Sequence, residues 1–198
     1  MESPYKGLVS DKWLNVTNKL IKLHPVSVEE WTEIVFKAWG DIFKSKIGSK
    51  PFQIGKDISP KPQIMGFLLH ELISLEIEKR YPHVWRKERS GKDKDLIFIP
   101  DNNFSVEIKT SSNKDRIFGN RSYAQKSLSG KKNKSGYYLT VNFEKFLEGG
   151  KLLPKILLIR FGWLDHVDWI GQASATGQQS RLPSDIYKYK LLVIFKSK

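Results

Sequence analysis

Three charged residues near the middle of the chain, Asp95, Glu107 and Lys109, have types and spacing that could hold a cation beside a reactive amine. Glu107 and Lys109 lie two positions apart in a stretch whose residues of the other parity are apolar. This alternation predicts a strand in which Glu107 and Lys109 share the polar face. Because Mg²⁺ characteristically takes one or two carboxylates from a protein, we predict a divalent-cation site here.

A β-hairpin should bring Asp95 to the same face. Residues 94–100 and 103–110 have strand character, and the residues between them, Asp-Asn-Asn, are typical of a tight turn. A three-residue turn would place Asp95 opposite Lys109, with Glu107 on the same side of the ribbon. Two carboxylates and one ammonium would then converge on a small site.

The chemistry that such a set predicts is hydrolysis of a phosphodiester. A divalent cation polarises the phosphate and lowers the pKa of bound water, and an ammonium can orient that water and offset charge in the transition state. We assign Asp95 and Glu107 as metal ligands, the backbone carbonyl of Ile108 as a further ligand, and Lys109 as the group that positions or activates the nucleophile. Asp101 is assigned to the turn. The alternative is that these charges form a solvated strand face.

A fourth carboxylate, Glu71, is predicted to support this site from a helix over residues 62–80. Helical spacing puts it on one face with Ile64, Leu68 and Leu75. A carboxylate in a buried apolar stripe is costly unless it is paired, so we expect Glu71 to face a cation, Lys109 or a metal-bound water. The alternative is that it reaches solvent at the edge of the stripe. No role is assigned to the histidines, whose spacing fits no zinc site: His24, His70, His83 and His166.

The whole chain, 1–198, has the length of one mixed α/β domain. Residues 1–85 should be mainly helical and residues 94–198 should form the sheet core with its DNA-contacting loops. Ser27 begins a capping box for the second helix. The helices are expected over residues 8–23, from 27 to about 47, and 62–80. The remaining strands are expected over residues 136–143, 155–163 and 187–195, and loops over 48–63, 86–93 and 171–183. A short helix can lie between the hairpin and the third strand.

Composition favours a polyanionic partner. Lys and Arg number 34 against 21 Asp and Glu, which leaves a formal charge of +13. The absence of cysteine excludes disulfides, thiol nucleophiles and cysteine-based metal sites, and nothing points to an organic cofactor. The N-terminal residues lack the apolar segment of a signal peptide, and no stretch approaches about 18 apolar residues, so we expect a cytoplasmic protein with no membrane partner.

The order of the chemical residues resembles the PD-(D/E)xK nuclease superfamily: Glu on a helix, then Asp, then Glu-x-Lys on the next strand. The chain departs from that pattern because Lys94 precedes Asp95 where the pattern has Pro. Residues 51–72, 94–112 and 117–125 resemble the ScaI-type family of type II restriction endonucleases. The resemblance is clearest over about residues 31–125.

This resemblance implies a restriction-endonuclease-like core, in which helices flank a central mixed sheet with an antiparallel catalytic hairpin. It also implies a homodimer that recognises a short palindrome in double-stranded DNA and cuts both strands with Mg²⁺. Carried onto this chain, it makes Asp95 and Glu107 the metal ligands, Lys109 the catalytic lysine and Glu71 the supporting carboxylate.

Two polar segments are predicted to contact DNA, because Arg pairs with guanine and Asn or Gln with adenine. One follows the catalytic strand and the other lies in the predicted loop over 171–183. For any one residue the alternative is an ordinary solvated loop. The lysine-rich stretches 44–50 and 131–134 are assigned to phosphates. The residues assigned to DNA contact are Ser111, Ser112, Asn113, Arg116, Asn120, Arg121, Gln125, Gln172, Gln178, Gln179 and Arg181.

Three other functions fit part of the sequence. A structure-specific or repair nuclease would share the chemistry but cut junctions, flaps or ends. A non-catalytic basic DNA-binding module would bind without Mg²⁺ and cleave nothing. An RNA-binding or ribosome-associated protein would fit the charge but leaves the helix carboxylate unexplained.

Overall fold

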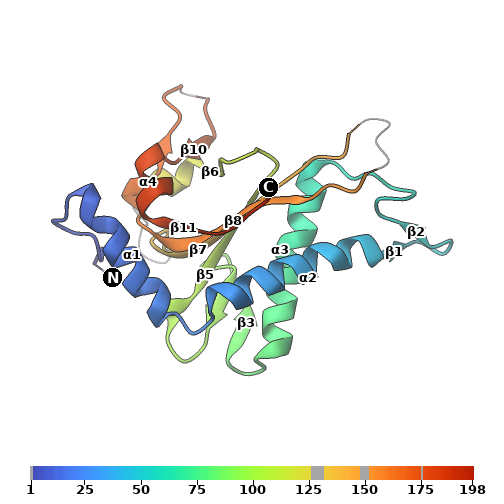
Figure 1. Ribbon diagram of the computed structural model, residues 1–198, viewed down its shortest axis with the longest axis horizontal. Coiled ribbons are helices and arrows are strands. Elements are labelled where there is room, and N and C mark those ends of the chain that lie inside the picture. The colour runs from blue at the N-terminus through green and yellow to red at the C-terminus, as the bar shows by residue number, and fades with distance from the viewer. Residues whose placement is uncertain (1, 126–131, 148–151, 175) are drawn as a thin grey trace.

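The computed structural model describes residues 2–125, 132–147, 152–174 and 176–198. A six-stranded mixed sheet runs through its centre in the order β11-β8-β7-β5-β4-β3 (Figure 1). Its strands are β3 (Trp85–Lys87), β4 (Leu96–Phe98), β5 (Val106–Ser111), β7 (Gly136–Phe143), β8 (Ile156–Leu164) and β11 (Leu191–Lys196). β5 and β7 run parallel, whereas the other neighbouring pairs are antiparallel. The predicted mixed sheet with an antiparallel hairpin is confirmed.

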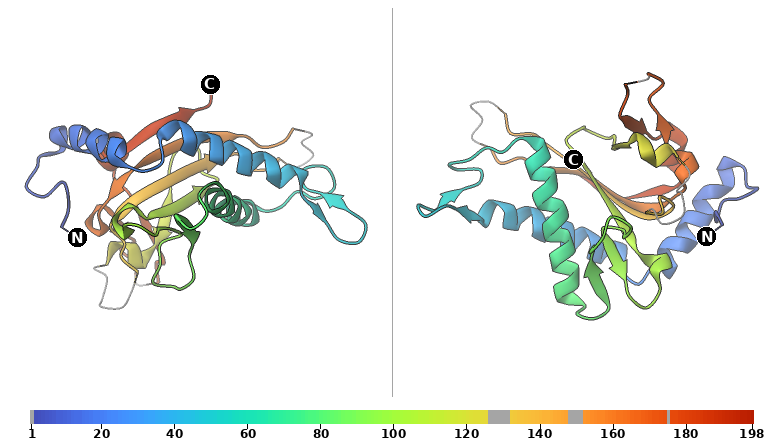
Figure 2. Two further views of the ribbon diagram at one scale, coloured as in Figure 1. Left: turned by 90° about the horizontal axis from the view of Figure 1, so that it is seen from below. Right: turned by 180° about the vertical axis from the view of Figure 1, so that it is seen from behind.

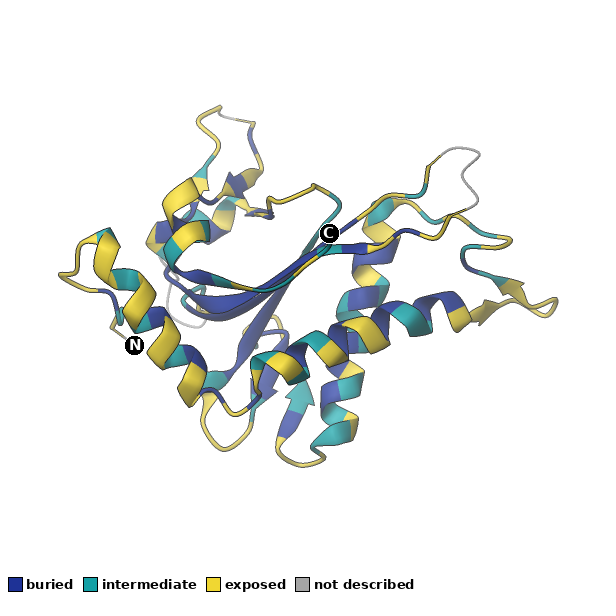
Figure 3. Cartoon of the chain, in the orientation of Figure 1, coloured by how far each residue is buried: buried dark blue, intermediate teal, exposed yellow. Residues whose placement is uncertain are grey.

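The central strands are buried on both faces, as the dark strands in Figure 3 show. Alternate residues of β7 point to opposite faces. Tyr137, Leu139 and Val141 belong to the main core, which the helices cover, whereas Tyr138 belongs to a second apolar cluster with Tyr123. The left-hand view of Figure 2 shows α1 and α2 on one side of the sheet and the β6 region on the other.

Three helices complete the main core. They are α1 (Ser10–Leu23), α2 (Val28–Lys44) and α3 (Pro62–Arg80). One half of the predicted capping box of α2 is present, since the Ser27 hydroxyl accepts a hydrogen bond of 3.1 Å from the Glu30 backbone N–H, whereas the Glu30 carboxylate accepts one from the Tyr81 hydroxyl. α2 ends at Lys44 rather than near Ile47, because the next residues form β1 (Lys46–Ile47), which pairs with β2 (Phe52–Gln53) inside the predicted loop.

The face of α3 that packs on the core differs from the predicted one. Met65, Leu69 and Ile73 are buried, whereas Ile64 and Leu75, predicted on the buried stripe, are each 52% exposed. Apolar residues occur around most of this helix, so their spacing fits more than one stripe. No helix in the described ranges is both long and apolar enough to cross a membrane.

Two segments predicted as separate polar stretches form a second, three-stranded sheet. β10 (Gln179–Arg181) lies between β6 (Phe118–Asn120) and β9 (Ile170–Gly171), with Gln179 opposite Asn120 and Arg181 opposite Phe118. The prediction of one long loop over 171–183 is therefore wrong at both of its ends. The short helix predicted after the hairpin is the 3₁₀ helix η2 (Arg121–Ala124).

Two strand boundaries near the C-terminus also differ from the predicted ones. β8 begins one residue later than predicted, and β11 begins at Leu191 rather than at residue 187. The residues before β11 form the short helix α4 (Ser184–Tyr189), whose Ile186 packs into the second apolar cluster. A further 3₁₀ turn, η3 (His166–Asp168), follows β8.

Candidate active site

The hairpin of β4 and β5 brings Asp95 and Glu107 to one place, with a register that differs from the predicted one by two residues. Leu96 pairs with Val106, which sets Asp95 opposite Glu107 rather than Lys109. The turn is longer than three residues because it contains the 3₁₀ helix η1 (Asn102–Phe104), capped by Asp101. A shift of two residues keeps side chains on the same face. Asp95 and Glu107 therefore still point to the same side of the hairpin, although the predicted register was wrong.

Asp95 lies directly before β4 and is buried. Its Oδ2 accepts a hydrogen bond of 2.7 Å from the backbone N–H of Ile108, and its Oδ1 lies 2.8 Å from Lys132 Nζ. Burial raises the pKa of Asp95, but His70 and the charges of Lys109 and Lys132 outweigh burial and hold that pKa well below its ordinary value. The carboxylate is therefore charged and fixed to the edge of β5.

Glu107 is buried on the face of β5 that turns away from the helices. Its Oε1 accepts hydrogen bonds from the hydroxyl of Tyr123 and, at 2.8 Å, from Lys109 Nζ. Its Oε2 lies 2.7 Å from Lys132 Nζ but accepts no well-directed hydrogen bond from any described residue. Burial raises the pKa of Glu107, and the Lys109 and Lys132 ammonium groups lower it further than burial raises it.

The two carboxylates can share one cation. Asp95 Oδ1 and Glu107 Oε2 lie 2.8 and 2.7 Å from the same ammonium nitrogen, that of Lys132. The described residues contain no cluster of three or more His, Cys, Asp or Glu in metal-binding geometry. Two carboxylates fit a small hard cation that completes its coordination with water and substrate oxygens. The predicted third ligand, the Ile108 carbonyl, accepts a hydrogen bond of 3.3 Å from Lys109 Nζ.

An aromatic ring and several amines surround these acids. Two ammonium groups lie over the Tyr123 ring, with Lys109 Nζ 4.5 Å and Lys134 Nζ 4.3 Å from its centre. Burial lowers the pKa of Lys94 to about 8, and the Lys94 ammonium donates to the Asn133 carbonyl at 3.2 Å. The site is thus more cationic than the single predicted lysine implies.

A close approach of α3 to β5 adds His70 to the site. A Cβ at Gly66 would lie 2.7 Å from Thr110 Oγ1, so only glycine lets the two elements come this near. One turn further along α3, His70 Nε2 lies 3.3 Å from Asp95 Oδ2. Burial lowers the pKa of His70, but Asp95 outweighs burial and raises that pKa above its ordinary value.

Glu71 lies at the rim of the site rather than within a buried stripe. Its side chain is 25% exposed and forms an ion pair with Lys87 of β3. Its other oxygen lies 3.6 Å from His70 Nδ1. Glu71 therefore faces a cation, but this cation is Lys87 rather than Lys109, and its partial exposure agrees with the alternative that it reaches solvent at the edge of the stripe. A metal-bound water as its partner stays a prediction.

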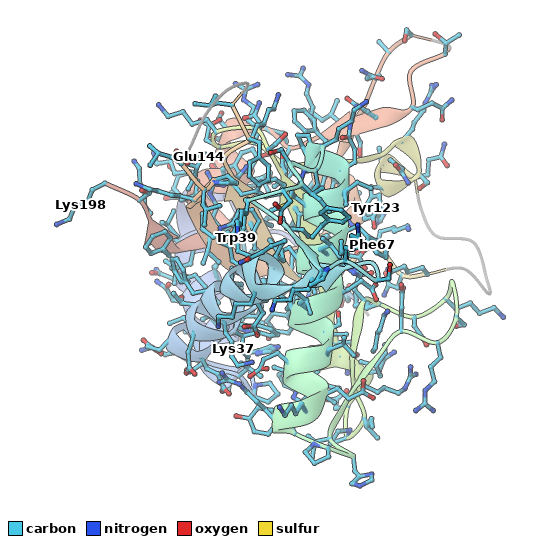
Figure 4. All side chains as sticks on the ribbon, turned by 90° about the vertical axis from the view of Figure 1, so that its right-hand side faces the viewer. Lys37, Trp39, Phe67, Tyr123, Glu144 and Lys198 are labelled. Atoms are coloured by element: carbon cyan, nitrogen blue, oxygen red, sulfur yellow. The ribbon has the colours of Figure 1, made fainter. Side chains whose placement is uncertain are left out.

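A cavity of about 580 Å³ lies between α3 and the second sheet and meets the site at His70 and Glu71. Side chains of α3, the end of β5 and the second sheet line it. Figure 4 shows Phe67 and Tyr123 on the same side of α3 in that view, with Trp39 on the other. The cavity joins predicted catalytic and DNA-contacting residues. Among its lining residues are Phe67, His70, Glu71, Ser111, Ser112, Phe118 and Gln179.

A second cavity, of about 490 Å³, is lined by several guanidinium groups. Arg116 and Arg181, both predicted to contact DNA, line it together with the buried Arg160 and with Asp115. Three basic side chains against one acid make this cavity suited to an anion such as a phosphate.

The other predicted DNA-contacting residues differ in how they are held. Arg121 donates to the carbonyls of Ser174 and Gly177, so it holds the loop before β10. Asn113 accepts hydrogen bonds from two backbone N–H groups of its own turn. Lys131, in the second lysine-rich stretch, lies outside the described residues. The remaining predicted contacts are exposed: Asn120, Gln125, Gln172 and Gln178.

Sequence reasoning missed four residues of the site. His70 has no role in the prediction, because a lone histidine is more often a surface or internally hydrogen-bonded residue than a base. Lys132 and Lys134 were assigned to phosphates, and Tyr123 was noted only within a stretch of family resemblance. Each of these residues comes from an element that folds back over the hairpin. Only the tertiary structure shows this, so no local pattern in the sequence could have identified them.

A mixed sheet covered by helices, with two acids and a lysine converging on one β-ribbon, is the arrangement of a nuclease of the restriction-endonuclease-like class. The chain belongs to the ScaI restriction endonuclease family, whose model matches residues 3–195. It is 48% identical over 194 residues to a protein of Streptomyces caespitosus described as type II restriction enzyme ScaI, covering 98% of this chain and 85% of that protein. No solved structure matches the chain.

Proposed function

We propose that the chain is a Mg²⁺-dependent type II restriction endonuclease that acts as a homodimer and cuts both strands of double-stranded DNA at a short palindrome. Membership of the ScaI restriction endonuclease family supports the reaction class and the DNA substrate. The observation that carries the assignment of the site is that one oxygen of Asp95 and one of Glu107 lie within 2.8 Å of a single cationic nitrogen, beside Lys109. All 198 residues would act as a single catalytic and DNA-binding domain.

In this proposal Asp95 and Glu107 hold the Mg²⁺, with the Ile108 carbonyl as a further ligand. When bound, the ion supplies Lewis acidity toward the scissile phosphate and acidifies a water. Lys109 orients the attacking water and offsets negative charge that develops on the phosphate. The backbone N–H of Ile108 and the imidazole of His70 fix the Asp95 carboxylate. Glu71 acts from the rim, through His70 and Lys87.

The cavity between α3 and the second sheet would receive the DNA backbone and the base edges next to the scissile bond. Ser111, Ser112 and Gln179 line it, and β10 also contributes Arg181 to the arginine-lined cavity. Arg116 and Arg181 would hold phosphates there and supply affinity without sequence information. The polar residues near the second sheet would read or flank the bases: Asn113, Asn120, Arg121, Gln125, Gln172 and Gln178.

The test is to incubate the protein with plasmid and phage DNA, with and without Mg²⁺, and to sequence the ends. Discrete fragments that all end at one palindrome, formed only with Mg²⁺, would support the proposal. Cleavage at junctions, flaps or free ends would favour a structure-specific nuclease instead. Sedimentation that shows only a monomer, both free and on a palindromic duplex, would reject the homodimer.

A further inference from the structure

Lys132 occupies a position that no other described lysine of the site shares. Its ammonium lies 2.8 Å from Asp95 Oδ1 and 2.7 Å from Glu107 Oε2, so it joins the two carboxylates. Its side chain is only 13% exposed. It comes from the segment that leads into β7 and not from the hairpin that carries the acids.

The neighbouring lysines make different contacts. Lys109 reaches Glu107 through the other oxygen, Oε1. Lys94 donates to the Asn133 carbonyl, and Lys134 lies over the ring of Tyr123. The amine of Lys132 is therefore the one placed to form ion pairs with both carboxylates.

We propose that Lys132 is an internal counter-cation that competes with the divalent ion for Asp95 and Glu107. This inference rests on the proposed metal site at those two residues. Mg²⁺ approaches its oxygen ligands to about 2.0–2.1 Å, and the same two oxygens now contact the ammonium. Both cations cannot occupy that position, so the ion binds as the ammonium leaves.

The displaced ammonium needs another anion, and a phosphate of DNA bound at the site would supply one. DNA binding would then draw Lys132 away from the carboxylates and free them for the ion. Because such coupling is reciprocal, a duplex must raise the affinity for metal by the same factor by which metal raises the affinity for that duplex. Without DNA, Lys132 stays between the two carboxylates, and the protein binds the divalent ion only weakly.

The experiment measures metal binding and not cleavage. Mn²⁺ is titrated calorimetrically into the full-length wild-type protein and into Lys132→Met, Lys134→Met and Asp95→Asn, without DNA, and free Mn²⁺ is followed by its paramagnetic resonance signal. Lys132→Met keeps the length of the side chain and removes its charge. We expect it to bind Mn²⁺ at least about tenfold more tightly than the wild type, because a competing charge has been removed.

Lys134→Met is the matched control, since it removes an equal charge from the same segment without a carboxylate contact. Equal tightening in both variants would show an effect of overall charge and overturn the proposal, as would unchanged affinity in Lys132→Met. Thermal unfolding is recorded first, and Lys132→Gln takes the place of Lys132→Met if the latter does not fold.

Two further arms separate this inference from the proposed metal site. Asp95→Asn should lose Mn²⁺ binding, and if it binds as the wild type does, the metal site itself is wrong. If it loses binding while Lys132→Met gains none, only the role of Lys132 fails. A duplex with a non-cleavable phosphorothioate at the site should raise the Mn²⁺ affinity of the wild type more than that of Lys132→Met, and an equal rise in both would exclude the coupling.

Discussion

The backbone N–H of Ile108 donates a hydrogen bond of 2.7 Å to Oδ2 of Asp95, so the catalytic strand itself holds the carboxylate that precedes β4. This bond joins the two arms of the hairpin at the point where the ladder of β4 and β5 has ended. The other oxygen of Asp95 stays directed at the cation position between the strands. Asp95 therefore has a structural role, as the acceptor for Ile108, and a proposed catalytic role, as a metal ligand. Different substitutions at this residue should separate the two roles.

Asp95→Asn should abolish cleavage while leaving the fold nearly intact. The asparagine carbonyl can still accept from Ile108, but an uncharged amide is a poor ligand for a hard divalent ion. Asp95→Ala should lose cleavage and also stability, by roughly 1–3 kcal/mol, because it leaves the buried Ile108 N–H without its acceptor. Plasmid cleavage and urea unfolding measured on both variants provide the test.

Asp101→Ala is the control for this pair. Asp101 is exposed and accepts from the Asn103 N–H in the turn, so its loss should affect the turn and leave cleavage intact. If Asp101→Ala were inactive and Asp95→Ala active, the assignment of the metal-binding carboxylate would be wrong.

Lys109→Ala should reduce cleavage by about 10²–10³-fold or more, because it removes a donor that stabilises charge in the transition state. Specific DNA binding should stay within a few fold of the wild type, since Lys109 is half-buried and contacts Glu107. Binding is measured with Ca²⁺ in place of Mg²⁺, and cleavage in single-turnover reactions. Near-normal turnover by this variant would remove Lys109 from the mechanism.

The shared face of Asp95, Glu107 and Lys109 could be predicted from the sequence because side-chain parity on a strand depends only on local alternation. Their register could not, because η1 lengthens the turn and no local rule distinguished that turn from a three-residue one. The error was harmless because a two-residue shift preserves parity.

Contacts between elements that are distant in the sequence explain the other wrong or missing predictions. The apolar residues of α3 allow more than one buried stripe, and its packing against α2 and β5 selects the stripe that contains Met65 and Leu69. Lys132 and His70 come from segments distant in sequence from the hairpin, and nothing in their local sequence indicates a carboxylate partner. The pairing of β6 with β10 is equally non-local.

Stability should fall as the pH is lowered from about 6.5 to about 4, because of His24. This imidazole is buried between α1 and the hairpin, where Nδ1 accepts a hydrogen bond of 3.2 Å from the Val26 N–H and Nε2 donates one of 3.1 Å to the Phe104 carbonyl. Burial lowers the pKa of His24 to about 4. Between about pH 6.5 and 4, His24 is protonated in the unfolded chain but not in the folded chain. Its contribution to the free energy of unfolding, about 3 kcal/mol, is therefore lost on acidification.

His24→Phe should remove that part of the slope, although it loses two hydrogen bonds and is less stable at pH 7. The raised pKa of His70 has the opposite sign, since its contribution is fully present below about pH 6.5 and is lost at higher pH. Urea unfolding at several pH values measures both effects. A slope between pH 4 and 6.5 that is unchanged in His24→Phe would contradict the assignment.

Gly66→Ala should lower both stability and activity. The added methyl would meet Thr110 Oγ1 at 2.7 Å, and the β-branched threonine has few rotamers with which to avoid it. We expect the free energy of unfolding to fall by about 1–3 kcal/mol and cleavage to weaken, because α3 must move outward and carry His70 away from Asp95.

Gly40→Ala on α2 is the matched control, since its methyl meets nothing within 4 Å. It should stabilise the protein by about 0.5–1 kcal/mol, the helix preference for Ala. Equal effects of the two changes would exclude the close-approach argument.

Gln179→Ala should weaken discrimination between DNA sequences more than it weakens binding in general. Gln179 is exposed on β10 and lines the cavity that also contains His70 and Ser111, so its amide is placed to meet a base edge near the scissile bond. Loss of one bidentate amide contact to adenine costs roughly 1–3 kcal/mol for the correct site and nothing for random DNA. Competition binding in the presence of Ca²⁺ measures the ratio of the affinity for the site to the affinity for a scrambled duplex.

Gln178→Ala changes the adjacent residue, whose side chain does not line this cavity, and it should leave the ratio near that of the wild type. A larger loss of discrimination in Gln178→Ala would mean that the opposite face of this strand reads the DNA.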